Sequence, residues 1–489
     1  MPSRVEAEFA VLGGGTSGCV VAGRLAEAGR DVLVVEAGPD YGALEAGRWP
    51  DDLVDARSIP ASHDWCYDSG DRYADRVVPF QRAKVIGGCS AHNGCVAAVG
   101  HRSDYDSWSI PGWSTADLEP FLPGVLSRLR VRLYRDDEAG RFHAACLDAA
   151  AATGWTRADD LCDLDGLDGF GLETVNVDGG VRFNAAFAYL DPVRDRVRVL
   201  GNTLVDRLEE EADGWLVDVS GGTIHARTVV LSGGAYGTPA ILQRSGFGDP
   251  TWLSEAGIRC VHALPGVGRN LHDHPMVEVA YARGEELERE IAAAVAAGLS
   301  RPDEQTLGKT RSSRAGEVYD LHVVPFFSAT QTGLLAGQVS IAAAVLTPRS
   351  RGFLRVRSGA AAAPPWIEHA YLEDPEGHDL AVMRDGVEFV RELASARPLR
   401  DLLGAPLATL DSDDDLLDAV VHYYHPVGTC ALGRGGDPPG VCDERARVGG
   451  RPGLVVADCS LLPQVPRANT NIPAVLVGEK VARLLLGER

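Results

Sequence analysis

The stretch Phe9-Ala10-Val11-Leu12-Gly13-Gly14-Gly15-Thr16-Ser17-Gly18 joins an apolar strand directly to a glycine-rich turn. A helical pattern follows from Cys19 to Ala28, and a second apolar strand, Val32–Val35, ends at Glu36. This order of strand, turn, helix and strand is the context in which a GxGxxG pattern binds a dinucleotide. The stretch therefore predicts an α/β fold that opens with a Rossmann-like unit.

Each glycine of this pattern has an expected task in binding the nucleotide. Gly13 permits the tight turn, Gly15 lets a pyrophosphate approach the backbone, and Gly18 lets helix and strand pack closely. The pyrophosphate is expected at the helix N-terminus, where backbone N–H groups are free. Glu36 is placed to accept hydrogen bonds from the ribose hydroxyls. The motif alone leaves open whether the cofactor is NAD or FAD.

Length, charge and cysteine content limit the class of protein. A chain of 489 residues is too long for one ordinary core, so two domains, or one with a large insertion, are expected. The formal charge of −22 disfavours binding to nucleic acid or to an anionic membrane. The ten cysteines are scattered and form no CxxC pair, so we expect no structural metal site and no disulfide framework. With no signal peptide or membrane-length apolar run recognised, a cytoplasmic location is expected.

Further motifs decide between the two cofactors. Glycine-dense segments follow at 83–94, 232–248 and 266–275, and the C-terminal part reads HPVGT at 425–429 and NTNIPA at 469–474. With these motifs the chain resembles the glucose–methanol–choline (GMC) family of FAD-dependent oxidoreductases over nearly its whole length. Within the family it is most similar to the choline-oxidising members, through the segments HDW at 63–65, GGCSAHNG at 87–94, DPEGHD at 374–379 and YHPVGT at 424–429.

The resemblance implies an α/β chain, α+β overall, in which a discontinuous Rossmann-like FAD-binding domain accompanies a substrate domain built on an antiparallel sheet. We expect residues 1–105, 195–275 and 440–489 in the FAD-binding domain, and 106–194 and 276–439 in the substrate-binding domain. Gln331 and Trp366 fall in the latter. The residues expected to bind FAD are Gly13, Gly15, Thr16, Ser17, Gly18, Glu36, Ala37, Gly87, Gly88, Ser90, His92, Asn93, Gly94, Val205, Gly234, Asp458 and Ile472.

Two C-terminal side chains are expected to carry the chemistry. Loss of hydride from an alcohol carbon requires the hydroxyl proton to leave as well, and a histidine is suited to accept it. A second polar group must hold the same oxygen and steady its developing charge. The resemblance puts His425 at the base position and Asn471 at the partner position, which Asn469 fits less well. His422 is expected to be a supporting or surface histidine.

The resemblance also implies how the flavin is held. The family counterpart of Asp458 lies beside the flavin, and the helix N-terminus near Ile472 is expected to face the isoalloxazine and favour its anionic reduced form. His92 stands where the choline-oxidising members carry a histidine bonded to their flavin. We favour covalent attachment of FAD through His92, with a non-covalent contact as the alternative.

The expected substrate pocket departs from that of the choline-oxidising members. Met276 stands where they have a glutamate that holds the trimethylammonium group, and a methionine cannot replace a carboxylate there. Glu278, two residues further along the same strand, is a candidate substitute. Gly94 replaces a serine near the flavin, and Tyr423 replaces a small aliphatic residue beside the base. Choline is therefore disfavoured as the substrate.

These features predict FAD-dependent oxidation of a polar primary alcohol to an aldehyde, with hydride passing to the flavin and His425 as base. Met276 and Tyr423 are expected to contact a small-molecule alcohol that is polyhydroxylated or amine-bearing, such as an amino sugar in antibiotic biosynthesis. Oxygen or another acceptor would reoxidise the flavin, so oxidase and dehydrogenase remain alternatives. A lyase of the hydroxynitrile type, with a structural FAD, is a further alternative. The oligomeric state is left open, with a homodimer as one alternative.

Overall fold

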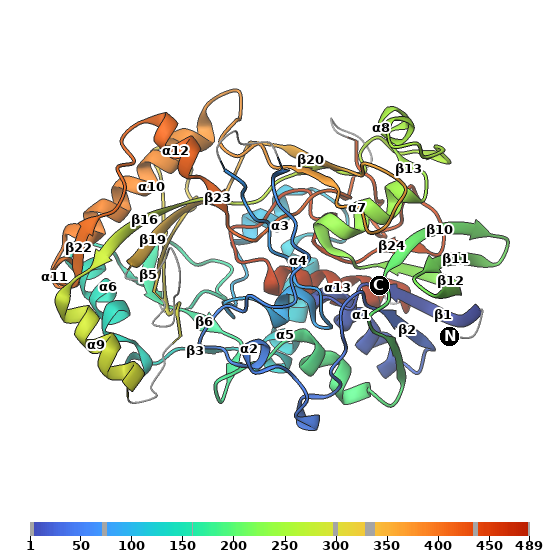
Figure 1. Cartoon of the computed structure of the whole chain (residues 1–489), viewed down its shortest axis with the longest axis horizontal. Coiled ribbons are helices and arrows are strands. Elements are labelled where there is room, and N and C mark those ends of the chain that lie inside the picture. The colour runs from blue at the N-terminus through green and yellow to red at the C-terminus, as the bar shows by residue number, and fades with distance from the viewer. Residues whose placement is uncertain are drawn as a thin grey trace.

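Two sheets organise the protein, one in each half of the molecule (Figure 1). The computed structural model describes residues 4–70, 76–158, 160–296, 302–327, 338–433 and 439–487. Gln331 lies outside these residues. All ten cysteines are free thiols. Within the described part of the chain, no helix combines the length and the apolar character needed to cross a membrane.

The nucleotide-binding sheet has seven strands in the order β10-β11-β12-β1-β2-β9, with β24 also paired to β12. Its parallel strands are β1 (Arg4–Leu12), β2 (Val32–Val35), β9 (Val197–Leu200), β12 (Gly222–Leu231) and β24 (Leu454–Val456). An antiparallel ribbon of β10 (Val205–Glu211) and β11 (Gly214–Val219) extends it. The apolar runs of the central strands follow from burial on both faces. Three distant parts of the chain thus meet in one sheet.

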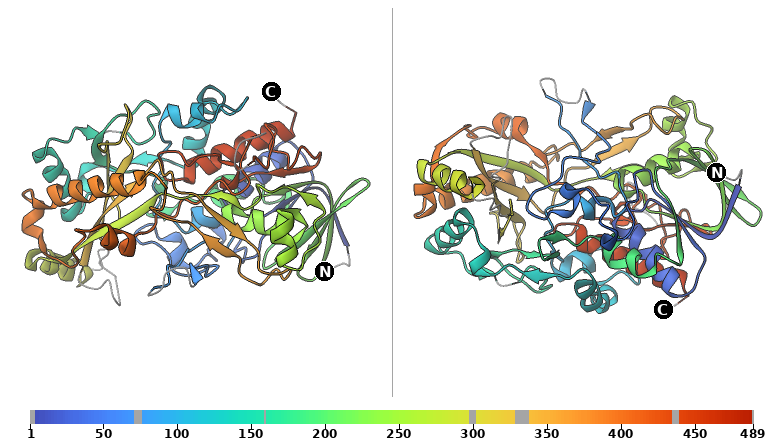
Figure 2. Two further views of the ribbon diagram at one scale, coloured as in Figure 1. Left: turned by 90° about the horizontal axis from the view of Figure 1, so that it is seen from above. Right: turned by 60° about the horizontal axis from the view of Figure 1, so that its bottom comes forward.

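The first helix, α1 (Thr16–Glu27), begins directly after the glycine turn rather than at Cys19. Gly15 is its N-cap, and the Cys19 N–H donates to the Gly15 carbonyl at 2.9 Å, so the turn itself starts the helix. The last helix, α13 (Asn471–Leu485), lies beside α1 in Figures 1 and 2. The Glu479 carboxylate accepts from Arg24 at 2.7 and 2.8 Å and from the Tyr189 hydroxyl at 2.8 Å. These buried bonds join the two ends of the chain.

The second sheet has eight strands in the order β22-β16-β19-β18-β17-β5-β4, with β23 also paired to β16. Its pairs are antiparallel except β4–β5, which confirms the predicted antiparallel sheet. The strands are β4 (Arg157–Ala158), β5 (Gly169–Leu172), β16 (Pro275–Arg283), β17 (Thr306–Thr310), β18 (Leu321–Phe326), β19 (Gln338–Val345), β22 (Leu403–Pro406) and β23 (Val421–His422).

Helices gather around this second sheet at the end of the molecule remote from both termini (Figure 1). They are α6 (Arg141–Ala152), α9 (Glu285–Ala296), α10 (His378–Ser395), α11 (Leu399–Leu402) and α12 (Asp413–Ala419). The other α-helices and strands are α2 (Asp51–Val54), α3 (Arg102–Ser107), α4 (Thr115–Leu118), α5 (Leu122–Arg128), α7 (Gly234–Arg244), α8 (Pro250–Glu255), β3 (Arg132–Leu133), β6 (Thr174–Val175), β7 (Val177–Asp178), β8 (Val181–Arg182), β13 (Phe247–Gly248), β14 (His262–Ala263), β15 (Arg269–Leu271), β20 (Gly352–Arg355) and β21 (Trp366–Glu368).

Packing changes one boundary expected from the sequence. Residues 106–194 were expected wholly in the substrate half, but α5 and the π-helical turn Ala186–Leu190 belong to the core of the nucleotide-binding half. The π-helical turn packs on α1 and α5 packs on α13, and so they cover apolar surface that the parallel sheet alone would leave exposed. Only the middle of this segment, with β4 and β5, joins the second sheet.

Candidate active site

One cavity of about 790 Å³ connects the glycine turn to the C-terminal motifs. His425, Asn471, Met276 and Tyr423 all line it, from three separate parts of the chain. The residues predicted to bind FAD that line the same cavity are Gly13, Gly15, Thr16, Ser17, Glu36, Ala37, Gly88, Ser90, His92, Asn93, Gly94, Val205, Gly234 and Asp458. The fold therefore brings nearly all of the predicted site residues to one space.

Three residues on the predicted FAD list do not line the cavity. At Gly18 a Cβ atom would lie 2.0 Å from the Gly13 carbonyl oxygen, so this glycine is needed where helix and turn touch. Gly87 has a φ of +87° and donates its N–H to the Gly14 carbonyl at 2.7 Å, which fixes the second glycine loop against the first. Ile472 is fully buried in the first turn of α13. These three residues lie behind the residues that line the cavity and pack against them.

The glycine turn presents free N–H groups to one end of the cavity. No side chain caps the N-terminus of α1, and no acidic residue lies in its first turn. The two carboxylate oxygens of Glu36 accept the N–H groups of Gly14 and Gly38, each at 2.8 Å. Burial raises the pKa of Glu36, while these two bonds oppose the shift. Each oxygen keeps a lone pair that a ribose hydroxyl could use.

His425 lies at the other end of the cavity, just after β23. Its backbone N–H donates to the Asp273 carboxylate at 2.9 Å, and its Nδ1 lies 3.0 Å from Nδ1 of His274. Pairing of β23 with β16 brings the two histidines together. Burial, and then the neighbouring His274, lowers the pKa of His425 well below its ordinary value. The imidazole is therefore neutral at physiological pH and available as a base.

Asn471 is the first residue of α13 and is only 8% exposed. Its amide nitrogen lies 3.5 Å from Oδ1 of Asn176, whereas its own Oδ1 is buried without a hydrogen-bond partner in the described structure. Asn469 also lines the cavity, and its Oδ1 is likewise unpartnered. No side chain caps the N-terminus of α13 at Thr470, so free N–H groups face the same region.

His422 is not a surface residue, contrary to one of the two expectations. It is 3% exposed, and its Nε2 lies 3.1 Å from Oε1 of Gln81. Burial lowers the pKa of His422 to about 3, so the ring is neutral. It does not line the cavity. Pairing of β23 with β16 takes this side chain into the protein.

His92 reaches the cavity from the second glycine loop. Its Nε2 lies 2.6 Å from the Ser62 carbonyl oxygen. Because a carbonyl oxygen only accepts, Nε2 carries the proton and Nδ1 keeps its lone pair. Burial lowers the pKa of His92, which favours this neutral form. The side chain is therefore chemically suited to act as a nucleophile toward a group in the cavity.

Sequence reasoning missed Glu304, which lines the cavity from the segment before β17. It lies opposite Gly94, where an added Cβ atom would come within 2.6 Å of the Glu304 carboxylate. Met276 and Glu278, on the same face of β16, line the cavity as well. Glu304 belongs to no motif, because only the pairing of distant strands brings it here. The one sequence signal of extra space beside Glu304 was the glycine at position 94, where the choline-oxidising members have a serine.

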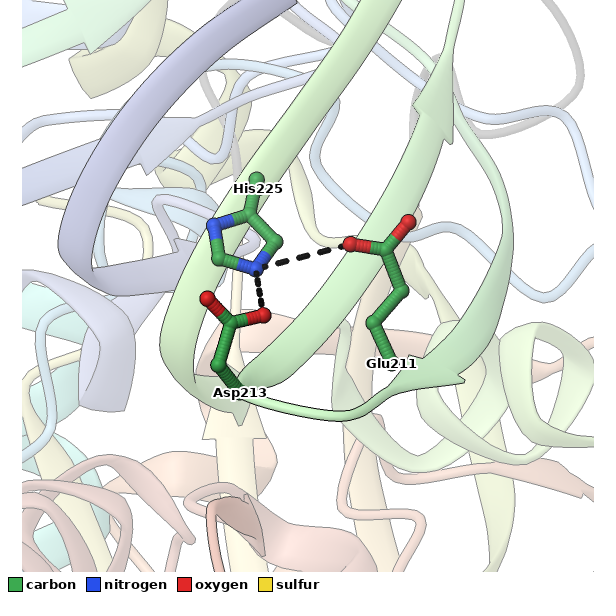
Figure 3. Close-up of side chains that lie close together, drawn as sticks. All are labelled: Glu211, Asp213 and His225. Carbon is green, nitrogen blue, oxygen red and sulfur yellow. Dashed lines mark ion pairs between the residues drawn. The ribbon is translucent and has the colours of Figure 1, made fainter.

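A separate group of side chains lies at the β10–β11 ribbon, away from the cavity lining. Nε2 of His225 lies 3.5 Å from Glu211 and 3.2 Å from Asp213, as Figure 3 shows, and its Nδ1 is 2.7 Å from Glu6. Such a set could hold a divalent cation. Arg4 already pairs with both Glu6 and Glu211 and supplies the balancing charge. The sequence-based expectation of no metal therefore stays a prediction.

Comparison with known proteins identifies the family of the chain. Residues 7–276 and 348–478 match the N-terminal and C-terminal parts of the family described as GMC oxidoreductase. The chain is 30% identical to choline oxidase of Arthrobacter globiformis, over 99% of this chain and 95% of that protein. It is 31% identical to mitochondrial choline dehydrogenase of Homo sapiens, over 99% and 91% of the two chains.

The fold is shared with solved structures over the whole chain. Pyridoxine 4-oxidase from Mesorbium loti superposes with a TM-score of 0.86 at 25% identity, and the match covers 99% of this chain and 100% of that one. Formate oxidase superposes with a TM-score of 0.85 at 24% identity, over 100% and 99% of the two chains, which speaks for the fold alone. Sequence and structure therefore agree that the chain belongs to the GMC oxidoreductase family of FAD-dependent enzymes.

Proposed function

We propose that this oxidoreductase converts a polar primary alcohol to an aldehyde, with His425 as the base. The observation that carries the proposal is the placement of a buried, neutral His425 and the unpartnered amide oxygen of Asn471 in one cavity with the glycine turn. In the family's chemistry the alcohol loses a proton and a hydride. The proton of the alcohol passes to His425.

The residues of the opposite end fit FAD. The uncapped N-terminus of α1 suits a pyrophosphate, the remaining lone pairs of Glu36 suit a ribose, and the glycines leave the backbone open to close approach. Asp458 accepts the N–H of Gly234 at 2.9 Å and so holds this part of the wall. When bound, FAD supplies the acceptor for the hydride. The free N–H groups at the start of α13 favour negative charge nearby.

The contact between the two histidines supports Nε2 as the nitrogen of His425 that acts, provided that His425 is the donor. Since both Nδ1 atoms lie 3.0 Å apart, one of them donates to the other. If His425 donates, its Nε2 keeps a lone pair and accepts the hydroxyl proton of the substrate. His274 then acts as a positioning residue, its own proton on Nε2. Burial lowers the pKa of His274 to about 3, so it stays neutral in that role.

We propose further that His92 would hold FAD covalently through its Nδ1 lone pair, which the Ser62 carbonyl leaves free. The new bond would replace one C–H bond of a ring methyl group and one N–H bond of the imidazole, and the two protons and two electrons would pass to the acceptor that reoxidises the flavin. Denaturation with acid tests this directly. Yellow colour that stays with the precipitated wild-type protein and is released from a His92→Ala variant supports attachment. Colour released from both supports the non-covalent alternative.

The substrate class follows from the cavity walls. Met276 in place of a carboxylate disfavours choline, while Tyr423 and Glu278 offer polar groups to a polyhydroxylated or amine-bearing alcohol, such as an amino sugar of the kind modified in antibiotic biosynthesis. Oxygen, or another acceptor if the enzyme is a dehydrogenase, completes the cycle. A cytoplasmic location and a homodimer also remain predictions.

Anaerobic mixing of the holoenzyme with primary alcohols, sugars, amino sugars and choline tests the function. Loss of the visible flavin absorbance with one class identifies the substrate, and readmission of air separates an oxidase from a dehydrogenase. Absorbance that no alcohol changes, together with cleavage of a cyanohydrin, would instead establish the lyase alternative.

A further inference from the structure

A pair of glutamates lies at the substrate end of the cavity, outside every motif. Glu304 lines the cavity, and Glu173 lies behind it with no exposed surface. Glu173 follows β5, and its N–H donates to the Gln305 carbonyl at 2.9 Å, so the two glutamates sit on adjacent segments. Burial raises the pKa of both carboxyl groups, and the charge of Glu304 raises that of Glu173 further. The pair resists ionisation until a cation is near.

Four acceptor oxygens at this end lack hydrogen-bond partners. Both oxygens of Glu173 and Oδ1 of Asn469 and of Asn471 are buried without a hydrogen bond in the described structure. Asn469 and Asn471 both line the cavity, and only 8% of Asn471 is exposed. An unsatisfied buried acceptor is costly, and the cost is removed by a group that donates. The missing partner is therefore rich in N–H or O–H groups.

The basic side chains that line the cavity do not supply this partner. Arg82 donates to the Tyr424 carbonyl at 2.9 Å, and Arg244 donates to the Asp206 carbonyl at 2.8 Å. Lys84 lies over the ring of Trp65, with Nζ 4.7 Å from its centroid. Among the described residues, none of these cations forms an ion pair with Glu304. A cationic ligand would supply the charge that balances an ionised Glu304.

The space at Glu304 exists because residue 94 is a glycine. A Cβ atom there would lie 2.6 Å from Oε2 of Glu304, closer than real Cβ contacts allow. Gly94 follows His92 on the same loop, so a ligand held by Glu304 lies next to the predicted flavin site. Tyr423, whose ring centroid is 4.4 Å from that of His425, also lines this end. A group bound at Glu304 and a hydroxyl at His425 share one cavity.

We propose that Glu304, with Glu173 behind it, binds a protonated primary or secondary amine of the substrate, so that this enzyme selects amino alcohols. The inference rests on the proposed function and names the substrate class of the same site. A quaternary ammonium such as choline carries the charge but no N–H, and it leaves the acceptors of Asn469 and Asn471 unsatisfied. A neutral polyol donates hydrogen bonds but brings no charge. An amine that retains its N–H groups meets both needs.

Titration calorimetry on the holoenzyme tests the amine subsite with two matched pairs, glucosamine against glucose and ethanolamine against ethylene glycol. In Glu304→Gln we expect the Kd of the amines to rise about 10- to 100-fold, and that of the neutral partners to stay within about twofold, since a hydrogen bond to a charged group is lost. Gly94→Ala, which displaces the carboxylate without removing it, is expected to weaken amine binding as well. Glu278→Gln changes a second cavity carboxyl group, which Ser340 already bonds, and is the comparison variant: the subsite predicts a smaller loss of amine affinity there than in Glu304→Gln.

The outcomes separate this inference from the proposed function. Flavin content and melting temperature like those of the wild type show that each variant is folded. Equal weakening of amines and neutral compounds in Glu304→Gln, or a larger loss in Glu278→Gln, overturns the subsite. Alcohols that reduce the flavin with no preference for amines would leave the function standing and refute the subsite. Amine binding that depends on Glu304, with no alcohol reducing the flavin, would support the subsite and refute the oxidation.

Discussion

A methyl group added at Gly18 is expected to disrupt the nucleotide end of the cavity. The Cβ of Gly18→Ala would lie 2.0 Å from the Gly13 carbonyl oxygen and 3.2 Å from the Ser232 side chain, whereas real Cβ atoms essentially never come within 3.0 Å of another atom. Helix and turn must therefore separate by about 1 Å, at the place where the free N–H groups of α1 converge.

Overpacking of this kind costs about 1–3 kcal/mol. If the whole cost falls on the FAD-bound form, the affinity for FAD drops roughly 5- to 150-fold. The assay is the ratio of flavin to protein after purification, together with the melting temperature. Gly124→Ala is the matched control, because Gly124 lies in α5 with nothing within 4 Å of its added Cβ. That substitution is expected to be neutral or to stabilise by about 0.5–1 kcal/mol. A Gly18→Ala protein with full flavin and the melting temperature of the control would refute the reasoning.

Three more predictions follow from the site and the core. His425→Gln is expected to slow anaerobic flavin reduction about 100- to 10,000-fold. His422→Gln should slow it much less, because of these two histidines only His425 lines the cavity. Equal losses of rate in stopped-flow measurements would contradict this. Since burial lowers the pKa of His425, its base form persists as pH falls, and the rate of reduction should decline only below pH 6.5, the ordinary value; a decline centred above that pH, in a protein that stays folded, would refute the assignment. Glu479→Gln leaves Arg24 without its buried partner and is expected to lower the free energy of unfolding by about 3–5 kcal/mol in denaturant titrations. Glu27→Gln, which removes a partly exposed partner of the same arginine, should lower it by under about 1 kcal/mol. Similar losses in the two variants would show that burial of the pair does not determine its contribution.

The nucleotide half could be predicted because its signal is local. The apolar strand, the glycine turn and Glu36 lie within one short stretch, and their spacing alone requires the helix to start beside the strand. The antiparallel character of the second sheet came instead from the resemblance to the family. His425 and Asn471 were predicted in the same way, from the C-terminal motifs HPVGT and NTNIPA.

Features that depend on distant contacts were not predicted. Glu304 has no motif around it and gains its surroundings only when β17 pairs with β5 and the loop at Gly94 folds over it. The packing of α5 on α13, which lies far away in sequence, was likewise not predicted. His422 was expected at the surface as one alternative, since its burial depends on the pairing of β23 with β16.

Hydride transfer from an alcohol to the flavin is the central claim, and isotopic substitution tests it most directly. Using the alcohol that the anaerobic screen selects, the rate of flavin bleaching is measured for the ordinary compound and for the compound deuterated at the carbinol carbon. The account predicts bleaching that is slower with deuterium, and that is nearly abolished in His425→Gln for both compounds. Bleaching at the same rate in His425→Gln as in the wild type, or a flavin that no alcohol reduces, would contradict it.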